Sequence, residues 1–200
     1  RRSSDLRIRC QPERLPQDGR NSADDRGSVG RPSDFEGLLE YGADVNAAEH
    51  ERGQTALMWA VAQRHADVAS LLIDSDADLH ARSEVWYQLE NTAGNTNPSG
   101  NFRMAHGGST PLLFAAHNGD VETARMLVAG GADVNDVAAS GTSALVIAAH
   151  SGHGPLGIFL LEQGADPNAA GAGYTALHAA VLRSQVELVE VLLEHGADLN

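Results

Sequence analysis

The 200-residue sequence contains no lysine, so all 14 of its basic residues are arginines. Aromatic residues make up only 4% of the chain, which suits helices packed through alanine and leucine. No apolar run approaches the roughly 18 residues of a membrane span, so we expect no membrane insertion. The single cysteine, Cys10, excludes an internal disulfide framework. These absences indicate a soluble protein, and they leave both a cytoplasmic and an exported location open.

The charge of the chain is strongly acidic and unevenly spread. The formal net charge is −13, although residues 1–34 hold eight arginines against six acidic residues. The acidity of the remainder argues against nucleic acids and anionic membranes as partners, because phosphate groups would be repelled. It would suit a basic partner protein, and it is equally what an ordinary solvated surface requires.

Two short amphipathic helices are predicted between Thr110 and Asn135. Thr110 can cap the first helix, and Pro111 suits its first position, where no N–H is needed. The apolar residues recur with helical spacing, at Leu112, Ala115 and Ala116 and then at Val121, Ala124, Leu127 and Val128. Asn118 and Gly119 separate the two helices, and Gly131 ends the second in a left-handed conformation. Neither helix could bury its stripe alone, whereas stacked copies could.

Copies of this unit are present. The unit begins at Thr55, Thr110, Ser143 and Thr175, and each start lies 21 residues before the matching end at Asp76, Gly131, Gly164 or Gly196. Arg64 and Asp76 stand where glycines stand in other copies, so we expect left-handed backbone at both. The connectors between units vary in length, which is typical of a solenoid whose connectors project on one face.

These units resemble ankyrin repeats, from the Thr-Pro-Leu-Leu-Phe-Ala-Ala motif at residue 110 to the Gly-Ala-Asp-Val-Asn motif at 131–135. The resemblance covers roughly residues 35–200. It implies an all-α solenoid of stacked helix-turn-helix units with projecting β-turn or hairpin fingers. We predict a partial repeat at 35–46, complete repeats at about 47–80, 105–135, 136–168 and 169–200, and an insertion loop at about 83–106. The composition suggests a bacterial-type array.

The two ends of the chain depart from this pattern. Residues 1–34 are too polar to fold alone, and we expect a disordered linker, an unusual cap or the product of a reading-frame error. The last of these is favoured, because a repeat comes into register half way through. At the other end, Leu188 and Val191 are expected to face a further repeat, so we expect the chain to be a fragment.

The insertion at 83–106 is the irregular feature. Its middle is rich in Asn, Thr, Gly and Ser and predicts a loop, whereas its ends carry large apolar residues such as Trp86 and Tyr87. Those ends could simply pack onto neighbouring connectors, or they could form a recognition element. Trp59 occupies the repeat position of Phe114 and Ile147, so it is predicted to lie in the core.

No catalytic or metal-binding motif is found. The sequence contains no phosphate loop, no cysteine pair and no His-Glu-x-x-His motif. His117 and His150 share a repeat position, but stacked repeats lie about 10 Å apart, too far for two ligands of one metal. The resemblance implies that His178 is structural and bonds the neighbouring connector. We therefore expect no cofactor, no metal and no catalysis.

The resemblance implies a partner-binding surface on the connector tips and the inner face of the first helices. The corresponding residues are Glu51, Arg52, Gln54, Gln63, Ser109, His117, Asn118, Ser140, Thr142, His150, Ser151, Tyr174 and Arg183. The insertion adds Trp86, Tyr87 and His106 as candidates. We predict a monomeric, non-catalytic scaffold that binds another protein of unknown identity. One alternative is a regulatory or targeting segment of a larger enzyme or sensor, and another is a remnant without a specific partner.

Overall fold

The computed structural model describes residues 43–91 and 101–199. The predicted tail at 1–34 and the first part of the predicted partial repeat lie outside the described residues, as does the middle of the insertion. The described elements are α2 (Ala56–Ala62), α3 (Ala66–Asp74), β1 (Val85–Asn91), β2 (Asn101–Gly107), α4 (Pro111–Asn118), α5 (Val121–Ala129), α6 (Ala144–Ser151), α7 (Gly154–Glu162), α8 (Ala176–Leu182) and α9 (Val186–Glu194).

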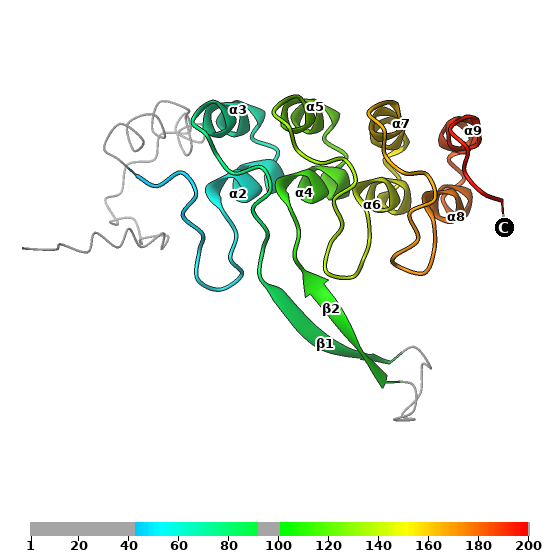
Figure 1. Cartoon of the computed structure of the whole chain (residues 1–200), viewed down its shortest axis with the longest axis horizontal. Coiled ribbons are helices and arrows are strands. Elements are labelled where there is room, and N and C mark those ends of the chain that lie inside the picture. The colour runs from blue at the N-terminus through cyan, green and yellow to red at the C-terminus, as the bar shows by residue number, and fades with distance from the viewer. Residues whose placement is uncertain (1–42, 92–100, 200) are drawn as a thin grey trace, which may run out of the picture.

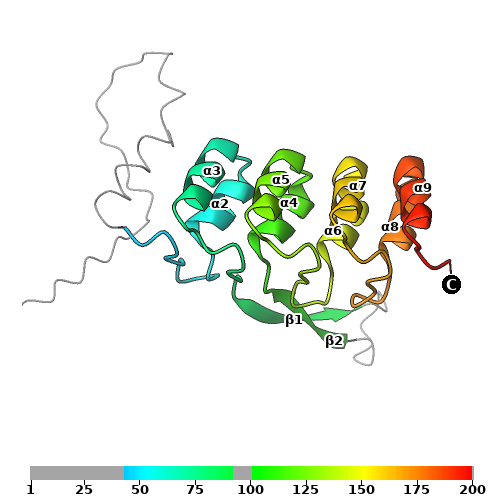
Figure 2. The same ribbon diagram turned by 45° about the horizontal axis from the view of Figure 1, so that its top comes forward.

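The helices form a two-layered stack that extends in one direction (Figures 1 and 2). The first helices of the repeats, α2, α4, α6 and α8, make one layer, and α3, α5, α7 and α9 make the other. Helix α4 packs against α2 and α6, and α7 packs against α9, so each repeat is covered by its neighbours. The predicted solenoid is therefore confirmed.

Helices start at the predicted capping residues. The hydroxyls of Thr55 and Ser143 accept the backbone N–H groups of Met58 and Val146, each at 3.4 Å. The prediction for Thr110 is wrong in one respect, because its buried hydroxyl makes no capping hydrogen bond although the residue occupies the cap position. Pro111 follows it, as predicted, at the first helical position.

His178 plays a structural part, but with a different partner from the one predicted. Its Nδ1 accepts the backbone N–H of Thr175 at 3.4 Å and lies 2.8 Å from the Thr175 hydroxyl. The histidine thus ties down the start of its own helix and not a neighbouring connector. The reason is its place at the third helical position, from which a side chain can reach back to the cap.

The turn between the two helices of a repeat needs a residue in the left-handed region. Gly119 and Gly152 take this conformation, with φ of 70° and 89°. Arg64 and Ser184 hold the same place in the outer repeats, with φ of 60° and 57°. Asp76 also has a positive φ, of 61°, as predicted from its glycine-like position.

The core lies between the two helical layers and between successive repeats. Its largest fully buried side chains are leucines, among them Leu57, Leu112, Leu127, Leu145 and Leu160. Alanines of the first helices, such as Ala115 and Ala148, are buried beside them and allow the layers to approach closely. The core is therefore aliphatic and continuous along the stack.

Two predictions about burial are wrong. Trp59 is 50% exposed, whereas Phe114 and Ile147 at the same repeat position pack against the core. The two inner residues have a described repeat on each side, while Trp59 lies on the first described helix. Leu188 is only 1% exposed, because it packs back against Gly157 of the preceding repeat, and Val191 also packs against the core.

Asparagines link the ends of successive repeats. The side chain of Asn135 donates to the carbonyl of Gly164 at 3.2 Å and accepts the N–H of Asp166 at 2.8 Å. The side chains of Asn46 and Asn168 each make the same two kinds of bond to the repeat that follows. Asn46 bonds Asp76 and Asp78, and Asn168 bonds Gly196 and Asp198. His80 holds this place in the repeat before the insertion, and in the described part of the chain it makes no such link.

The ends of the insertion form a two-stranded antiparallel sheet that projects from the stack (Figure 1). Its register pairs Val85 with Gly107 and Asn91 with Asn101. The base is closed by backbone bonds from Ser83 N–H to the Ser109 carbonyl and from Gly108 N–H to the Ser83 carbonyl, both 3.1 Å. The two ends of the segment predicted as a loop at 83–106 are thus the paired strands of a hairpin.

Candidate binding surface

The connectors that precede the first helices form four fingers, at residues 47–54, at 83–91 together with 101–109, at 136–142 and at 169–174. Each finger presses on the next through a glycine. A Cβ on Gly141 would lie 2.8 Å from the Gly171 carbonyl oxygen, and a Cβ on Gly53 would lie 3.2 Å from the Glu84 nitrogen. Side chains at these points would separate the fingers, so glycine allows them to form one continuous surface.

Arg82 fixes the hairpin finger to the finger that follows it. Its guanidinium donates to the carbonyls of Gly108 and Val137 at 3.0 and 2.7 Å, and it forms an ion pair with Asp136 at 2.5 Å. A planar guanidinium can serve all three acceptors at once. The base of the hairpin is thereby held in a fixed position against the next repeat.

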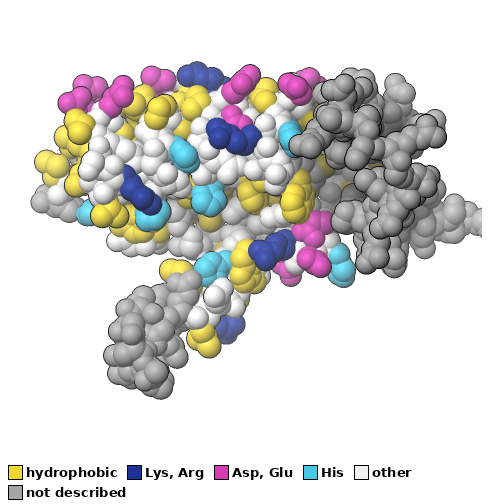
Figure 3. All heavy atoms as spheres, turned by 180° about the vertical axis from the view of Figure 1, so that it is seen from behind, with side chains coloured by type: hydrophobic (Ala, Val, Ile, Leu, Met, Phe, Trp, Pro, Cys, Tyr) yellow, Lys and Arg dark blue, Asp and Glu magenta, His cyan; other side chains and the backbone are white. Residues whose placement is uncertain are grey.

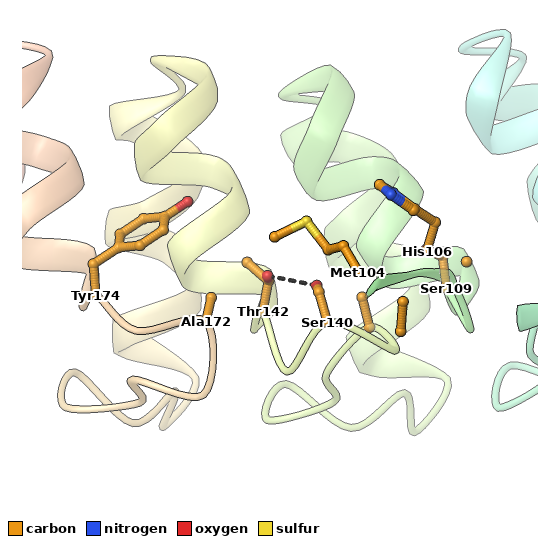
Figure 4. Close-up of a pocket in the computed structure, with 10 residues that line it drawn as sticks. Met104, His106, Ser109, Ser140, Thr142, Ala172 and Tyr174 are labelled. Carbon is orange, nitrogen blue, oxygen red and sulfur yellow. Dashed lines mark hydrogen bonds between the residues drawn. The ribbon is translucent and has the colours of Figure 1, made fainter. Parts of the chain in front are cut away.

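A groove of about 270 Å³ lies between the hairpin and the next two fingers. We call it the β2 groove. It is lined by Met104, Ala105, His106, Gly107, Ser109, Ala138, Ser140, Thr142, Ala172 and Tyr174. Figure 4 shows Tyr174 on one side and Met104 and His106 on the other, with the bonded Ser140 and Thr142 hydroxyls, 2.7 Å apart, between them. Among the residues that the structure describes, the lining contains neither a carboxylate nor a guanidinium.

A second hollow, also of about 270 Å³, lies between the first finger and the start of β1 and is lined by Glu51, Arg52, Glu84 and Trp86. The Arg52 guanidinium lies 5.0 Å from the centre of the Trp86 ring. Trp86 in turn stacks on His106, with centroids 5.7 Å apart. Arg52 is thereby held on one side of this hollow by a cation–π contact.

The first finger is organised by the carboxylate of Glu49. It accepts the backbone N–H groups of Glu51, Arg52 and Gln54 at 2.6, 2.7 and 3.2 Å. Desolvation acts to raise the pKa of Glu49, but these three hydrogen bonds and the charge of Arg52 outweigh it, so the pKa lies below its ordinary value. The charged form of Glu49 therefore stabilises the finger that carries Glu51 and Arg52.

The predicted binding surface also includes the C-terminal ends of the first helices. Asn118 donates to the carbonyls of Val61 and Ala62 at 3.2 and 2.9 Å, and Arg183 donates to the carbonyl of His150 at 2.7 Å. These bonds satisfy carbonyls at the ends of the preceding helices. The two side chains thus hold neighbouring repeats together as well as lying on the predicted surface.

The histidines at these helix ends are exposed. His117 Nδ1 lies 3.4 Å from the Ser151 hydroxyl, and the His150 ring lies 5.9 Å from the Tyr174 ring. Through Tyr174 this row continues into the β2 groove. Seen from behind, histidine and arginine side chains lie across the middle of the stack, while acidic side chains gather along the edge of the second helices (Figure 3).

The structure brings most of the predicted residues together and leaves three apart. Tyr87 lies on the other face of the hairpin, under the Arg103 guanidinium at 5.0 Å. Gln63 caps the C-terminal end of helix α2 and is exposed, and Gln54, the last residue of the first finger, is half-buried. In the part of the chain that the structure describes, no group of three or more His, Cys, Asp or Glu residues could hold a metal ion.

Sequence reasoning missed Met104 and Glu84, which line the two hollows. Met104 lies two residues from His106 and so on the same face of β2. The alternation of residues 101–107 could have revealed it, had the segment been taken as a strand.

The family model for ankyrin repeats in three copies matches residues 33–83, 85–171 and 112–200. The chain belongs to the ankyrin repeat family. Ankyrin repeats are modules of protein–protein interaction and are not catalytic. Among the described helices of this ankyrin repeat chain, none has the length and apolar character needed to cross a membrane.

Several curated relatives are similar to parts of this ankyrin repeat chain. The nuclear factor NF-kappa-B p105 subunit of Gallus gallus is 34% identical over 97 residues, which are 48% of this chain and 8% of that protein. "Probable E3 ubiquitin-protein ligase XBOS32" of Oryza sativa subsp. japonica is 29% identical, over 48% of this chain and 28% of that protein. Ankyrin repeat and SOCS box protein 6 of Mus musculus is 67% identical over 27 residues, 14% of this chain and 6% of that protein. The chain thus spans less than a third of each of these relatives.

Proposed function

We propose that this chain is a non-catalytic scaffold that binds another protein through its finger tips and the inner ends of its first helices. The observation that carries the proposal is the continuous finger surface with its two hollows. Eight of the sixteen residues selected from the sequence line these hollows: Glu51, Arg52, Trp86, His106, Ser109, Ser140, Thr142 and Tyr174.

The contrast between the fingers and the stack supports this proposal. The stack buries its large side chains among themselves and is closed by hydrogen bonds between repeats. The hairpin finger instead exposes Trp86 and Tyr87 to solvent. Exposed aromatic side chains on a rigid support are typical of sites where binding energy concentrates.

The experiment compares two double variants on opposite sides of the molecule. The finger variant is Ser140→Arg with Thr142→Arg. The control variant is Glu122→Arg with Glu162→Arg on the exposed faces of α5 and α7, and it adds more positive charge than the finger variant does. Binders are selected on the wild-type chain from a displayed library of protein fragments, and their affinities are measured by biolayer interferometry. Circular dichroism melts establish that both variants fold.

We expect the finger variant to weaken the selected binders by about tenfold or more, which corresponds to roughly 1.4 kcal/mol. The control should change their affinity by less than about twofold, as is usual for surface changes outside an interface. If the control pair weakened binding and the finger pair did not, the partner surface would lie on the second helices and the proposal would be wrong.

A second candidate function is a regulatory or targeting segment of a larger enzyme or sensor. The observation in its favour is that the chain matches only 8% of the p105 subunit and 28% of the rice E3 ligase. Sequencing the transcript on both sides of the codons for Arg1 and Asn200 tests it. An open reading frame that encodes a catalytic domain would support this candidate, and stop codons close to both ends would exclude it.

A further inference from the structure

We propose that the outer edge of β2 is the docking site for an extended, uncharged segment of the partner protein, which adds a third strand to the hairpin and places side chains in the β2 groove. This inference rests on the proposed function and specifies the kind of partner. It concerns the strand Asn101–Gly107 and the two fingers beside it.

The first argument is the unpaired backbone of β2. Within residues 43–91 and 101–199 the sheet has two strands, so β2 pairs with β1 alone. Every second residue of such a strand points its N–H and C=O away from the partner strand. A row of unpaired groups of this kind is a template for another extended chain.

The second argument is that this edge already accepts a neighbouring backbone at its base. The N–H of Ala139 donates to the Gly107 carbonyl at 3.0 Å. Beyond this contact the finger turns away from β2. The turn is closed by the N–H of Gly141, which donates to the Ala138 carbonyl at 2.8 Å. A partner strand would continue along β2 the pairing that Ala139 begins.

The third argument is that the edge lacks the usual protection. Exposed strand edges are commonly blocked by charged side chains or proline. Residues 101–107 contain no proline. Their one charged residue, Arg103, lies over the Tyr87 ring and does not line the groove. Both views show the hairpin lying below the fingers that follow it (Figures 1 and 2), and the β2 groove lies between the hairpin and those fingers.

The groove selects the chemistry of the segment. The chain carries a formal net charge of −13, yet the described residues that line the groove include no carboxylate and no guanidinium. A charged side chain placed there would lose its hydration without gaining an ion pair. Small residues at Ala138 and Ala172 leave room, the hydroxyls of Ser140 and Thr142 offer hydrogen bonds, and Met104 and Tyr174 supply apolar walls. Small or β-branched uncharged side chains match this lining.

The test uses the full 200-residue chain and a displayed library of short random linear peptides. Selected peptides are resynthesised with a single N-methyl group at each position in turn, and their affinities are measured by titration calorimetry. N-methylation removes one backbone donor and leaves the side chain unchanged. Strand addition predicts that N-methylation at every second residue lowers the affinity about tenfold, because only those N–H groups face β2. Methylation at the residues between them should have little effect.

Two protein variants accompany the peptide series. Thr142→Glu places a carboxylate in the groove, and we expect it to weaken the peptides at least about tenfold. Leu89→Glu adds the same charge to β1, which does not line the groove, and it should leave affinity within about twofold.

Each other outcome overturns the inference in its own way. Losses from N-methylation that do not alternate, together with an effect of Thr142→Glu, would leave the proposed finger surface intact and exclude strand addition. A library that yields no saturable peptide excludes a linear segment as the occupant. Dimerisation of the free chain in sedimentation equilibrium, abolished by Thr142→Glu, would show that a second copy takes the edge.

Discussion

The helical stack and the hairpin finger use apolar side chains in opposite ways. Leu127 of the stack is completely buried, whereas Leu89 of the hairpin is 67% exposed. The stack derives its stability from burial between repeats. An isolated two-stranded hairpin is marginally stable, and this one is held at its base by Ser83, Ser109 and the Arg82 guanidinium. Folding therefore depends on the stack, whereas the hairpin leaves Leu89, Tyr87 and Trp86 exposed and buries little apolar surface.

The largest expected effect is the loss of a buried leucine from the stack. Leu127→Ala should lower the free energy of unfolding by about 2–5 kcal/mol through the cavity it leaves. Leu89→Ala, its counterpart in the hairpin, should change that free energy by less than about 0.5 kcal/mol. Urea unfolding followed by circular dichroism measures both. Equal losses in the two variants would mean that the hairpin contributes to the core after all.

A smaller effect is expected at the turns inside the repeats. A Cβ on Gly152 would meet no atom within 4 Å, so Gly152→Ala isolates the cost of left-handed backbone. We expect it to destabilise the chain by roughly 1–2 kcal/mol. The reverse exchange, Arg64→Gly, should stabilise it by up to about 1 kcal/mol, because φ at Arg64 is already positive. Thermal melts of the two variants should therefore shift in opposite directions, and a shift in the same direction would contradict this account.

The smallest effect concerns the first finger and its pH dependence. The pKa of Glu49 is lowered in the folded chain, so its stabilising hydrogen bonds are fully present above the ordinary glutamate pKa and are lost as the pH falls through the lowered value. The amide proton signals of Glu51 and Arg52 in NMR spectra should follow this titration. In Glu49→Gln they should show no such step, and a step that persisted would assign the titration to another group.

Much of the stack could be predicted from the sequence, because repeat spacing fixes which residues begin helices and which turn. Thr55, Ser143 and the left-handed Arg64 and Asp76 follow from that spacing alone. The burial of Trp59 could not be predicted in the same way, because it depends on what covers the first described helix.

The predicted direction of Leu188 failed for a related reason. A repeat position gives the face of a helix, but which neighbour that face meets depends on how successive repeats are placed against each other. In the candidate site, too, repeat position predicts some residues but not others. The finger residues Ser140, Thr142 and Tyr174 follow from their repeat positions, whereas Met104 follows only once residues 101–107 are known to form a strand that pairs with β1.

The closure of the hairpin base has a consequence for how such a protein can change over evolutionary time. The backbone bonds between Ser83, Gly108 and Ser109 bring the two ends of the insertion side by side. Any segment whose ends meet at that spacing can therefore enter the gene at this point without shifting the helices on either side. Changes in this insertion and changes in the helical core then fall on separate stretches of the same chain, so natural selection can act on one without altering the other.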